Sequence, residues 1–228
     1  SPNGSLNMET LMSIQPDLYL IYPFELDNQE KYAEKGIQTL LISEYLESTA
    51  LGRLEWIKVF GLLLGDYSRA ETYFLETEKK YFVQTQPVDS TKTLFFNLPF
   101  KDNWNMPSSN SITANMANDA GFNYIYSDLI SDNAVRAKEK VWNDAMQCEY
   151  WIIIASRPKE FTLNDLIAED DIYREFPSVK NNKVIFCNTS TTEYFTKGVV
   201  EPDILLNELI AAKDGRELTD LKYFRILK

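Results

Sequence analysis

The chain has 228 residues, of which 44% are hydrophobic and 13% aromatic, enough to bury a sizeable core in one large domain or two lobes. Its net charge of −11 argues against a nucleic-acid backbone or an anionic membrane surface as partner, because both attract Lys and Arg. With no histidine, the chain has no His general base, no Ser-His-Asp triad and no histidine zinc site.

The two cysteines, Cys148 and Cys187, form no CxxC pair, so the sequence supports neither a zinc motif nor a redox motif. We expect both to be inert thiols at the edges of one core, with a disulfide between them left open. No apolar run approaches the roughly 20 residues that cross a bilayer. Residues 1–18 lack the pattern of a signal peptide, so we expect that it was removed or that the start of the gene product is absent.

The first third of the chain alternates between helix and strand patterns. Helical spacing after a capping Asn7 predicts a first helix. The continuous apolar run at 18–22 predicts a buried parallel strand, and residues 37–42 form a second predicted strand. A polar helix over 27–35 lies between these strands. This β-α-β order favours a parallel sheet with a right-handed crossover.

Two helices then follow, over 52–64 and from Asp66 to about Gln84, and Pro87 to Ser90 is the one linker-like break. Beyond it the α/β alternation resumes. We predict strands at 93–97, 150–155 and 183–187, and helices at 111–120, 134–146, 163–169 and 202–213, with a helical turn at 171–176.

Several segments in the same order resemble one known family. They are 47–65 (ESTALGRLEWIKVFGLLLG), 102–111 (DNWNMPSSNS), 118–124 (NDAGFNY), 139–152 (EKVWNDAMQCEYWI), 180–184 (KNNKV), 198–203 (GVVEPD) and 221–224 (LKYF). The ordered set resembles the helical-backbone class of periplasmic substrate-binding proteins, which serve ABC importers of iron chelates, haem and cobalamin. It is most similar to a subgroup found in Bacteroidetes-type organisms.

This resemblance implies an α/β fold with two α/β lobes, each with a central, mostly parallel sheet, joined by one long backbone helix, and a ligand cleft between the lobes. It divides the chain into a partial N-terminal lobe (1–65), a connecting helix (66–86) and a C-terminal lobe (87–228). The N-terminal lobe is expected to be incomplete, because the family's N-x-E-x-(L/M)-x-x-x-x-P-D-L segment lies here at 7–18, close to the first residue.

The resemblance also implies a non-enzymatic function without a cofactor. The chain would bind a metal chelate, haem or a corrinoid outside the cytoplasm, in the periplasm or as a lipoprotein, and deliver it to an ABC permease. Contact with the membrane would then come only through a lipid anchor outside this chain.

Candidate ligand-binding residues are those that follow predicted strands, since clefts of α/β sheets lie at the carboxyl ends of strands. Trp104 on a polar loop offers a large ring to stack a macrocycle or shield a chelate, unless it only plugs that loop. Arg53 and Arg157 are candidates to grip a negative oxygen, although Arg53 has Glu47 and Glu55 as ordinary partners. The remaining candidates are Met106, Tyr45, Tyr194 and Glu25, with Phe100, Phe195 and Glu44 as further members of the same loops.

In relatives, one exposed glutamate per lobe pairs with arginines of the permease, and Glu9 and Glu139 are the matching positions here. Charge pairs of this kind steer docking. The competing interpretation is a carboxylate that stabilises a helix N-terminus.

Two other function classes stay open. The chain could be an interaction module that has lost small-ligand binding. It could also be a metal-dependent enzyme in which Glu169, Asp170 and Asp171 hold Mg²⁺, although a solvated charged turn explains that run equally simply.

Overall fold

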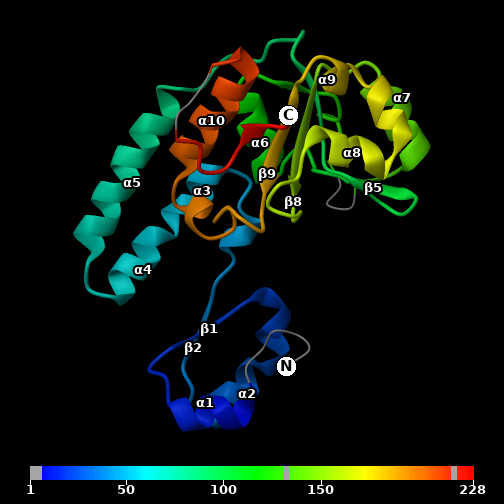
Figure 1. Cartoon of the computed structure of the whole chain (residues 1–228). Coiled ribbons are helices and arrows are strands. Elements are labelled where there is room, and N and C mark those ends of the chain that lie inside the picture. The colour runs from blue at the N-terminus through cyan, green and yellow to red at the C-terminus, as the bar shows by residue number, and fades with distance from the viewer. Residues whose placement is uncertain (1–6, 131–133, 217–219) are drawn as a thin grey trace. The chain divides into compact units, whose positions relative to one another are not determined.

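The structure is a computed structural model that describes residues 7–130, 134–216 and 220–228 (Figure 1). It divides into two compact units, Ser1–Glu47 and Ser48–Lys228. The predicted division into a lobe, a connecting helix and a second lobe stays a prediction, and all helices after residue 48 belong to the second unit.

The first unit has the predicted β-α-β order. Its elements are α1 (Met8–Ile14), β1 (Tyr19–Ile21), the 3₁₀ helix η1 (Pro23–Asn28), α2 (Gln29–Glu34), β2 (Thr39–Leu41) and the 3₁₀ helix η2 (Glu44–Leu46). The two strands are parallel, with Tyr19 opposite Thr39. Asn7 caps α1, since its side-chain oxygen accepts the Glu9 N–H at 2.9 Å. A small buried core consists of Leu11, Ile21, Tyr32 and Ile37.

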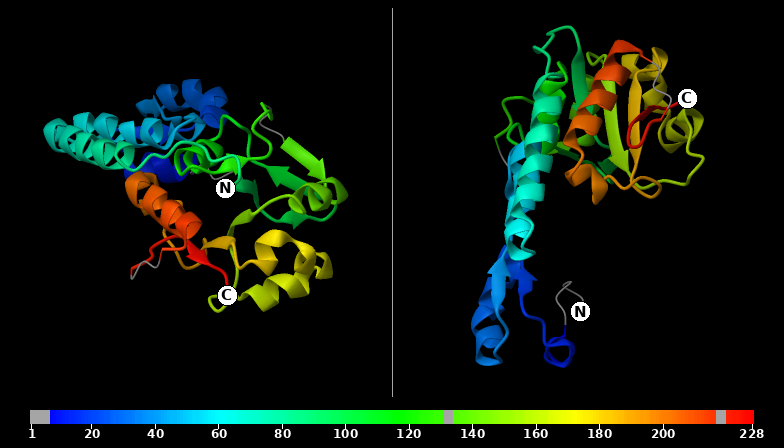
Figure 2. Two further views of the ribbon diagram at one scale, coloured as in Figure 1. Left: turned by 90° about the horizontal axis from the view of Figure 1, so that it is seen from above. Right: turned by 90° about the vertical axis from the view of Figure 1, so that its left-hand side faces the viewer.

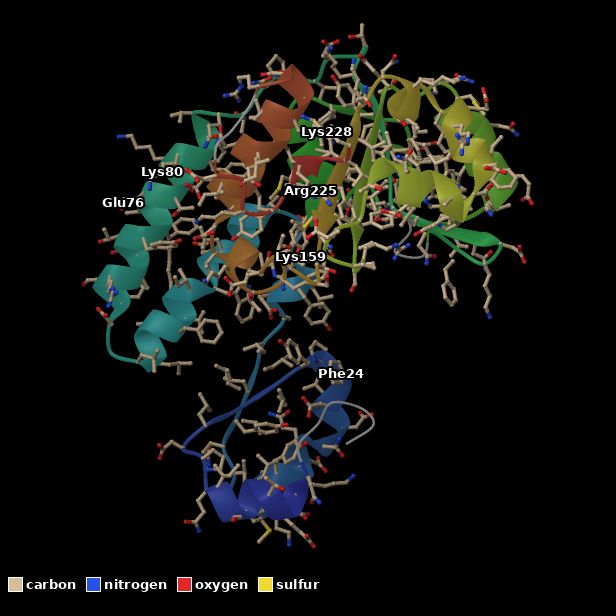
Figure 3. The ribbon with its side chains drawn as sticks, in the orientation of Figure 1. Phe24, Glu76, Lys80, Lys159, Arg225 and Lys228 are labelled. Atoms are coloured by element: carbon tan, nitrogen blue, oxygen red, sulfur yellow. The ribbon has the colours of Figure 1, made fainter. Side chains whose placement is uncertain are left out.

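The second unit begins with three helices, α3 (Ala50–Glu55), α4 (Ile57–Leu63) and α5 (Tyr67–Phe82). The single helix predicted over 52–64 is thus interrupted at Trp56. The long helix predicted over 66–86 is α5, whose exposed side carries Glu76 and Lys80 (Figure 3). Close packing of α4 on α5 requires a glycine at position 61, because a Cβ there would lie 2.5 Å from the Cβ of Ala70.

The centre of the second unit is a five-stranded sheet in the order β10-β9-β8-β3-β6. All neighbouring strands are parallel except β10, which runs antiparallel to β9. The strands are β3 (Thr93–Phe96), β6 (Asn123–Tyr124), β8 (Tyr150–Ala155), β9 (Val184–Asn188) and β10 (Arg225–Ile226). The strands β3, β8 and β9 read as continuous apolar runs because both faces of the sheet are covered.

Helices cover both faces of this sheet. The helix α10 (Pro202–Asp214) lies on one side with α5, and α8 (Leu163–Glu169) and α9 (Pro177–Lys180) lie on the other (Figures 1 and 2). The remaining helices are α6 (Ile112–Asp119), α7 (Lys138–Ala145) and the 3₁₀ helices η3 (Asp171–Glu175) and η4 (Lys197–Val199).

A second, antiparallel sheet follows β3 and corrects two predictions. It consists of β4 (Pro99–Phe100), β5 (Asn103–Met106) and β7 (Ala134–Ala137) in that order. The segment 98–107 is therefore not a loop, and the helix predicted to begin at 134 begins at Lys138, after β7.

Trp104 is correspondingly a core residue. It lies in β5 with a fully buried side chain, and its indole Nε1–H donates to the Phe96 carbonyl at 2.8 Å. The indole of Trp151 donates to the next carbonyl, that of Asn97, at 2.7 Å. Both rings pack on Phe95, with centroids 6.0 and 5.1 Å from it. Packing and a satisfied donor together explain why this tryptophan is inside.

The two cysteines are buried, free thiols near opposite ends of neighbouring strands. Cys187 pairs with Ile154 in the register of β8 and β9, whereas Cys148 precedes Ile154 by six residues. Six strand residues span roughly 20 Å, too far for the roughly 7 Å Cα separation that a disulfide tolerates. Burial raises the pKa of the Cys187 thiol to about 11, which keeps it unreactive.

The C-terminal segment is held by one buried carboxylate. Glu208 in α10 is 2% exposed and accepts three successive backbone N–H groups, from Lys222 (2.7 Å), Tyr223 (2.9 Å) and Phe224 (2.8 Å). The strand β10 follows directly and pairs with the edge of β9.

We expect Glu208→Ala to lower the free energy of unfolding by about 3 kcal/mol or more, because it leaves three backbone donors without their charged acceptor. Urea unfolding followed by circular dichroism measures this loss. Glu76→Ala, at an exposed position of α5, is the control and should change stability by less than about 0.5 kcal/mol. Equal effects of the two substitutions would contradict this role of Glu208.

Candidate ligand-binding site

The first unit exposes an aromatic surface at the carboxyl ends of its two strands. This aromatic platform consists of Tyr22 and Phe24, which follow β1, and Tyr45, which follows β2. The rings of Tyr22 and Phe24 are stacked, with centroids 5.6 Å apart and an interplanar angle of 16°, and Tyr45 meets Tyr22 edge-on at 5.6 Å. Phe24 is 65% exposed and Tyr45 42%, so the platform faces solvent (Figure 3).

Glu25 supports this platform from within and does not itself face solvent. Its buried carboxylate accepts the Tyr19 hydroxyl at 3.2 Å and the Tyr22 N–H at 3.4 Å. The second contact fixes the backbone that carries the stacked pair. The structure therefore places the predicted ligand residue Glu25 beneath the rings.

In the second unit, Asn188 ties together the loops that follow β8 and β9. Its amide nitrogen donates to the carbonyls of Arg157 (3.0 Å) and Pro158 (3.1 Å). Its amide oxygen accepts the N–H of Arg157 (3.1 Å) and both the N–H (3.2 Å) and hydroxyl (2.8 Å) of Ser190. This buried side chain keeps the carboxyl edge of the sheet in one arrangement.

Arg157 is engaged within the protein. Its guanidinium makes two bonds to the Glu169 carboxylate, at 2.8 and 3.1 Å, and one to the Ser156 carbonyl at 3.0 Å. A bidentate pair of this kind occupies the donors that an anionic ligand would use.

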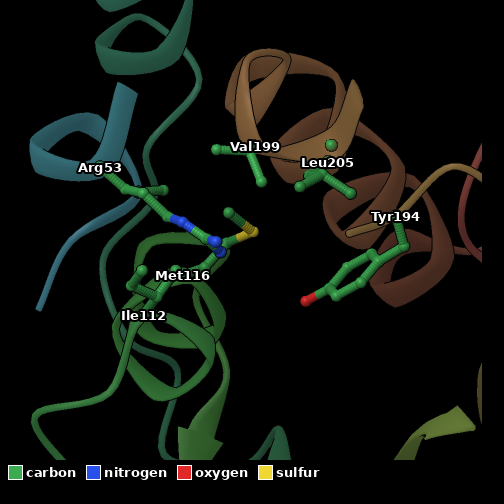
Figure 4. A pocket seen from close by; sticks show the side chains of 8 residues that line it. Arg53, Ile112, Met116, Tyr194, Val199 and Leu205 are labelled. Carbon is green, nitrogen blue, oxygen red and sulfur yellow. The ribbon is translucent and has the colours of Figure 1, made fainter. Parts of the chain in front are cut away.

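Arg53 and Tyr194 lie together at a small hollow in the second unit (Figure 4). The guanidinium and the phenol project towards it from α3 and from the segment after β9, between apolar side chains that include Met116 and Leu205. Burial raises the pKa of Tyr194 to about 12, so its hydroxyl stays protonated at neutral pH. The volume of about 40 Å³ holds a water molecule or two, not a macrocycle.

The other sequence-predicted residues fall into two groups. Met106 shares the buried face of β5 with Trp104, so neither side chain lies on the exposed loop predicted for it. Phe100, at the tip of the β4–β5 hairpin, and Phe195, beside Tyr194, are exposed. Glu44 begins η2, next to Tyr45.

The two predicted docking glutamates occupy matching helix positions. Glu9 lies in the first turn of α1 and Glu139 in the first turn of α7, and both are exposed. Their placement in early helix turns is as predicted, while their role stays a prediction.

The acidic run that suggested a metal site is paired with cations. Glu169 binds Arg157, Asp170 lies 2.7 Å from Lys138, and Asp171 lies 3.7 Å from Arg174. Within the residues that the structure describes, no three His, Cys, Asp or Glu side chains come together as a metal site would need.

Sequence reasoning missed Tyr22 and Phe24 as individual candidates, although it placed the segment 23–25 after a strand. Two aromatic residues at the end of an apolar strand, separated only by Pro23, are a usable signal. Asn188 gave no such signal, because three of its five hydrogen bonds go to backbone atoms of Arg157 and Pro158, about thirty residues earlier in the chain.

Parallel α/β units with aromatic and polar side chains at the carboxyl ends of their strands are typical of ligand-binding proteins. The sequence model of the periplasmic binding protein family matches residues 1–191. The chain belongs to this family, whose matching structures are substrate-binding proteins.

Solved structures show the same fold. A TroA-like periplasmic binding protein, FepB, from Veillonella parvula superposes with a TM-score of 0.70 at 16% identity, covering 99% of this chain and 76% of that one. A periplasmic heme binding protein from Pseudomonas aeruginosa gives 0.68 at 14% identity, covering 98% and 81%. These likenesses confirm the predicted α/β class.

An uncharacterized lipoprotein of Methanocaldococcus jannaschii is 24% identical over 209 residues, which cover 89% of this chain and 49% of the relative. The chain thus spans about half the length of this curated relative. Family membership supports an extracytoplasmic location. Among the described residues, no helix combines the length and apolarity that crossing a membrane requires. The Bacteroidetes subgroup and the incomplete lobe stay predictions.

We expect Asn188→Ala to speed amide hydrogen exchange at Arg157 and Ser190 by about tenfold or more, because five hydrogen bonds of one side chain are lost. Exchange measured by mass spectrometry, with Asn181→Ala at an exposed position as control, tests this. Unchanged protection of both loops would show that they hold their arrangement without Asn188.

Proposed function

We propose that this chain is an extracytoplasmic solute-binding protein that captures an iron chelate, haem or a cobalamin-type ligand and delivers it to an ABC importer. The observation that carries the proposal is the aromatic platform, exposed at the carboxyl ends of β1 and β2 in a member of the periplasmic binding protein family. Tyr22 and Phe24 are already stacked in the structure, and preorganisation of this kind lowers the entropy cost of binding.

The chemistry of the platform suits this ligand class. Macrocycles and the organic shells of metal chelates present broad apolar faces, which aromatic rings cover without needing charge. Structural neighbours include a heme binding protein and a siderophore-binding protein in complex with Fe³⁺-Desferal. The proposal extends that ligand class to this chain.

The alternative is an interaction module without a small ligand. It has the same fold but predicts no saturable binding of any chelate or macrocycle. A metal-dependent enzyme is the less supported alternative, because Glu169 and Asp170 are paired with Arg157 and Lys138.

We also propose that Glu9 and Glu139 dock the chain on the permease. They lie one in each unit, in the first turn of a helix, and both carboxylates are exposed. Exposed charges in such positions raise association rates more than they add affinity. The same proposal includes a lipid anchor, outside this chain, that would hold the protein at the membrane.

We expect Phe24→Ala to weaken ligand binding by about tenfold or more, since removing a phenyl face from an apolar contact costs about 1.5–3 kcal/mol. Isothermal titration calorimetry with haemin, cyanocobalamin and a ferric hydroxamate measures the affinity.

Phe82→Ala is the matched control for this experiment. It removes the same side chain at a similar exposure, 59% against 65%, from the end of α5. Equal loss in the two variants would contradict a binding role for the platform, and no binding of any ligand by the unsubstituted chain would favour the interaction module.

We expect Glu9→Lys and Glu139→Lys each to slow association with the permease by about tenfold at low salt, with a smaller effect at high salt. Surface plasmon resonance on permease held in lipid nanodiscs measures the rate. Glu76→Lys adds the same charge on α5 and serves as control. An equal slowing by all three substitutions would indicate a general charge effect in place of two docking points.

A further inference from the structure

The unit that carries the aromatic platform is strongly acidic. Residues 1–47 contain eight carboxylates and two lysines, a net charge of −6, out of −11 for the whole chain. More than half of the net charge thus resides on about a fifth of the residues. We infer that the ligand of the platform is uncharged or cationic, as in ferric hydroxamates, and that anionic chelates are excluded. This inference rests on the proposed function.

Two carboxylates lie beside the platform itself. Asp27 follows Phe24 by three residues in η1, and residues three apart share one face of a 3₁₀ helix. Glu44 precedes Tyr45 in η2. Asp27 is exposed, so its charge acts on whatever covers Phe24.

The two lysines of the first unit are too few to neutralise its eight carboxylates. Lys31 lies in α2, where its ammonium donates to the Asn28 side chain at 3.0 Å, and Lys35 ends that helix. The helix of a β-α-β unit runs from the carboxyl end of its first strand to the amino end of its second. Lys35 therefore lies towards the amino edge, away from the rings.

The segments that follow β3, β8 and β9 in the second unit are balanced in charge. Residues 97–110, 156–162 and 189–201 contain four acidic and four basic residues. They are Asp102, Glu160, Glu193 and Glu201, with Lys101, Arg157, Lys159 and Lys197. Arg157 is held by Glu169, and Lys197 lies 2.6 Å from Glu193. Lys159 is exposed (Figure 3). We therefore attribute the selection of ligands by charge to the first unit.

The test uses ferrioxamine B in three forms that share one chelate and differ in charge. The parent carries a free ammonium, its N-acetyl derivative is neutral and its N-succinyl derivative is anionic. Two carboxylates within about 8 Å of the ligand change its affinity by roughly fivefold per unit of ligand charge in water. We expect calorimetry at about 20 mM salt to show the tightest binding for the ammonium form, weaker binding for the acetyl form and the weakest for the succinyl form. These differences in affinity should shrink at about 0.5 M salt, where the charges are screened.

The double variant Asp27→Asn, Glu44→Gln should reduce the differences in affinity between the three forms of ferrioxamine B. The control Glu76→Gln on α5 should leave these differences unchanged. Cyanocobalamin, which has no net charge, should bind in preference to haemin, which carries two propionates.

Equal affinities, or tighter binding of the succinyl form or of haemin, would overturn the charge inference and leave the proposed function standing. No binding of any of these five ligands would overturn the proposed function, and the inference with it.

Discussion

Two indole hydrogen bonds determine much of the second unit. Trp104 and Trp151 donate to the consecutive carbonyls of Phe96 and Asn97, where β3 ends. Without the two indoles, the carbonyl groups at the end of β3 would need hydrogen bonds from water or from a loop. Because the donor of Trp104 comes from β5, the antiparallel hairpin is attached to the parallel sheet at this point. The start of the segment that follows β3 on the carboxyl edge is fixed by that attachment.

The order of helices and strands could be predicted from the sequence where burial is simple. Buried parallel strands such as β8 read as apolar runs, and α10 begins at a proline, as expected for a first turn. Trp104 was misplaced because the segment around it is polar on average. Residues 103–106 alternate exposed and buried, which is a strand with one covered face, but two periods are too short to separate that pattern from a loop.

The candidate site was less predictable, because it depends on what each side chain finds nearby. The position after a strand correctly indicated an edge for Tyr45 and Arg157. It did not reveal that Arg157 is already bound by Glu169, twelve residues later, or that Glu25 turns inward to Tyr19. Ion pairs and internal hydrogen bonds of this kind are properties of the folded arrangement, and a residue's type and position along the chain do not specify them.

The clamp that Glu208 places on the C-terminal segment has a consequence for solubility. The strand β9 pairs with β8 on one side and, at Ile185 and Phe186, with β10 on the other, and the backbone just before β10 is anchored to α10. Without that anchor, β9 would present an open row of amide and carbonyl groups flanked by apolar side chains. Such a strand recruits further strands from other molecules. By holding β10 on the edge of β9, the Glu208 carboxylate thus disfavours self-association through the five-stranded sheet.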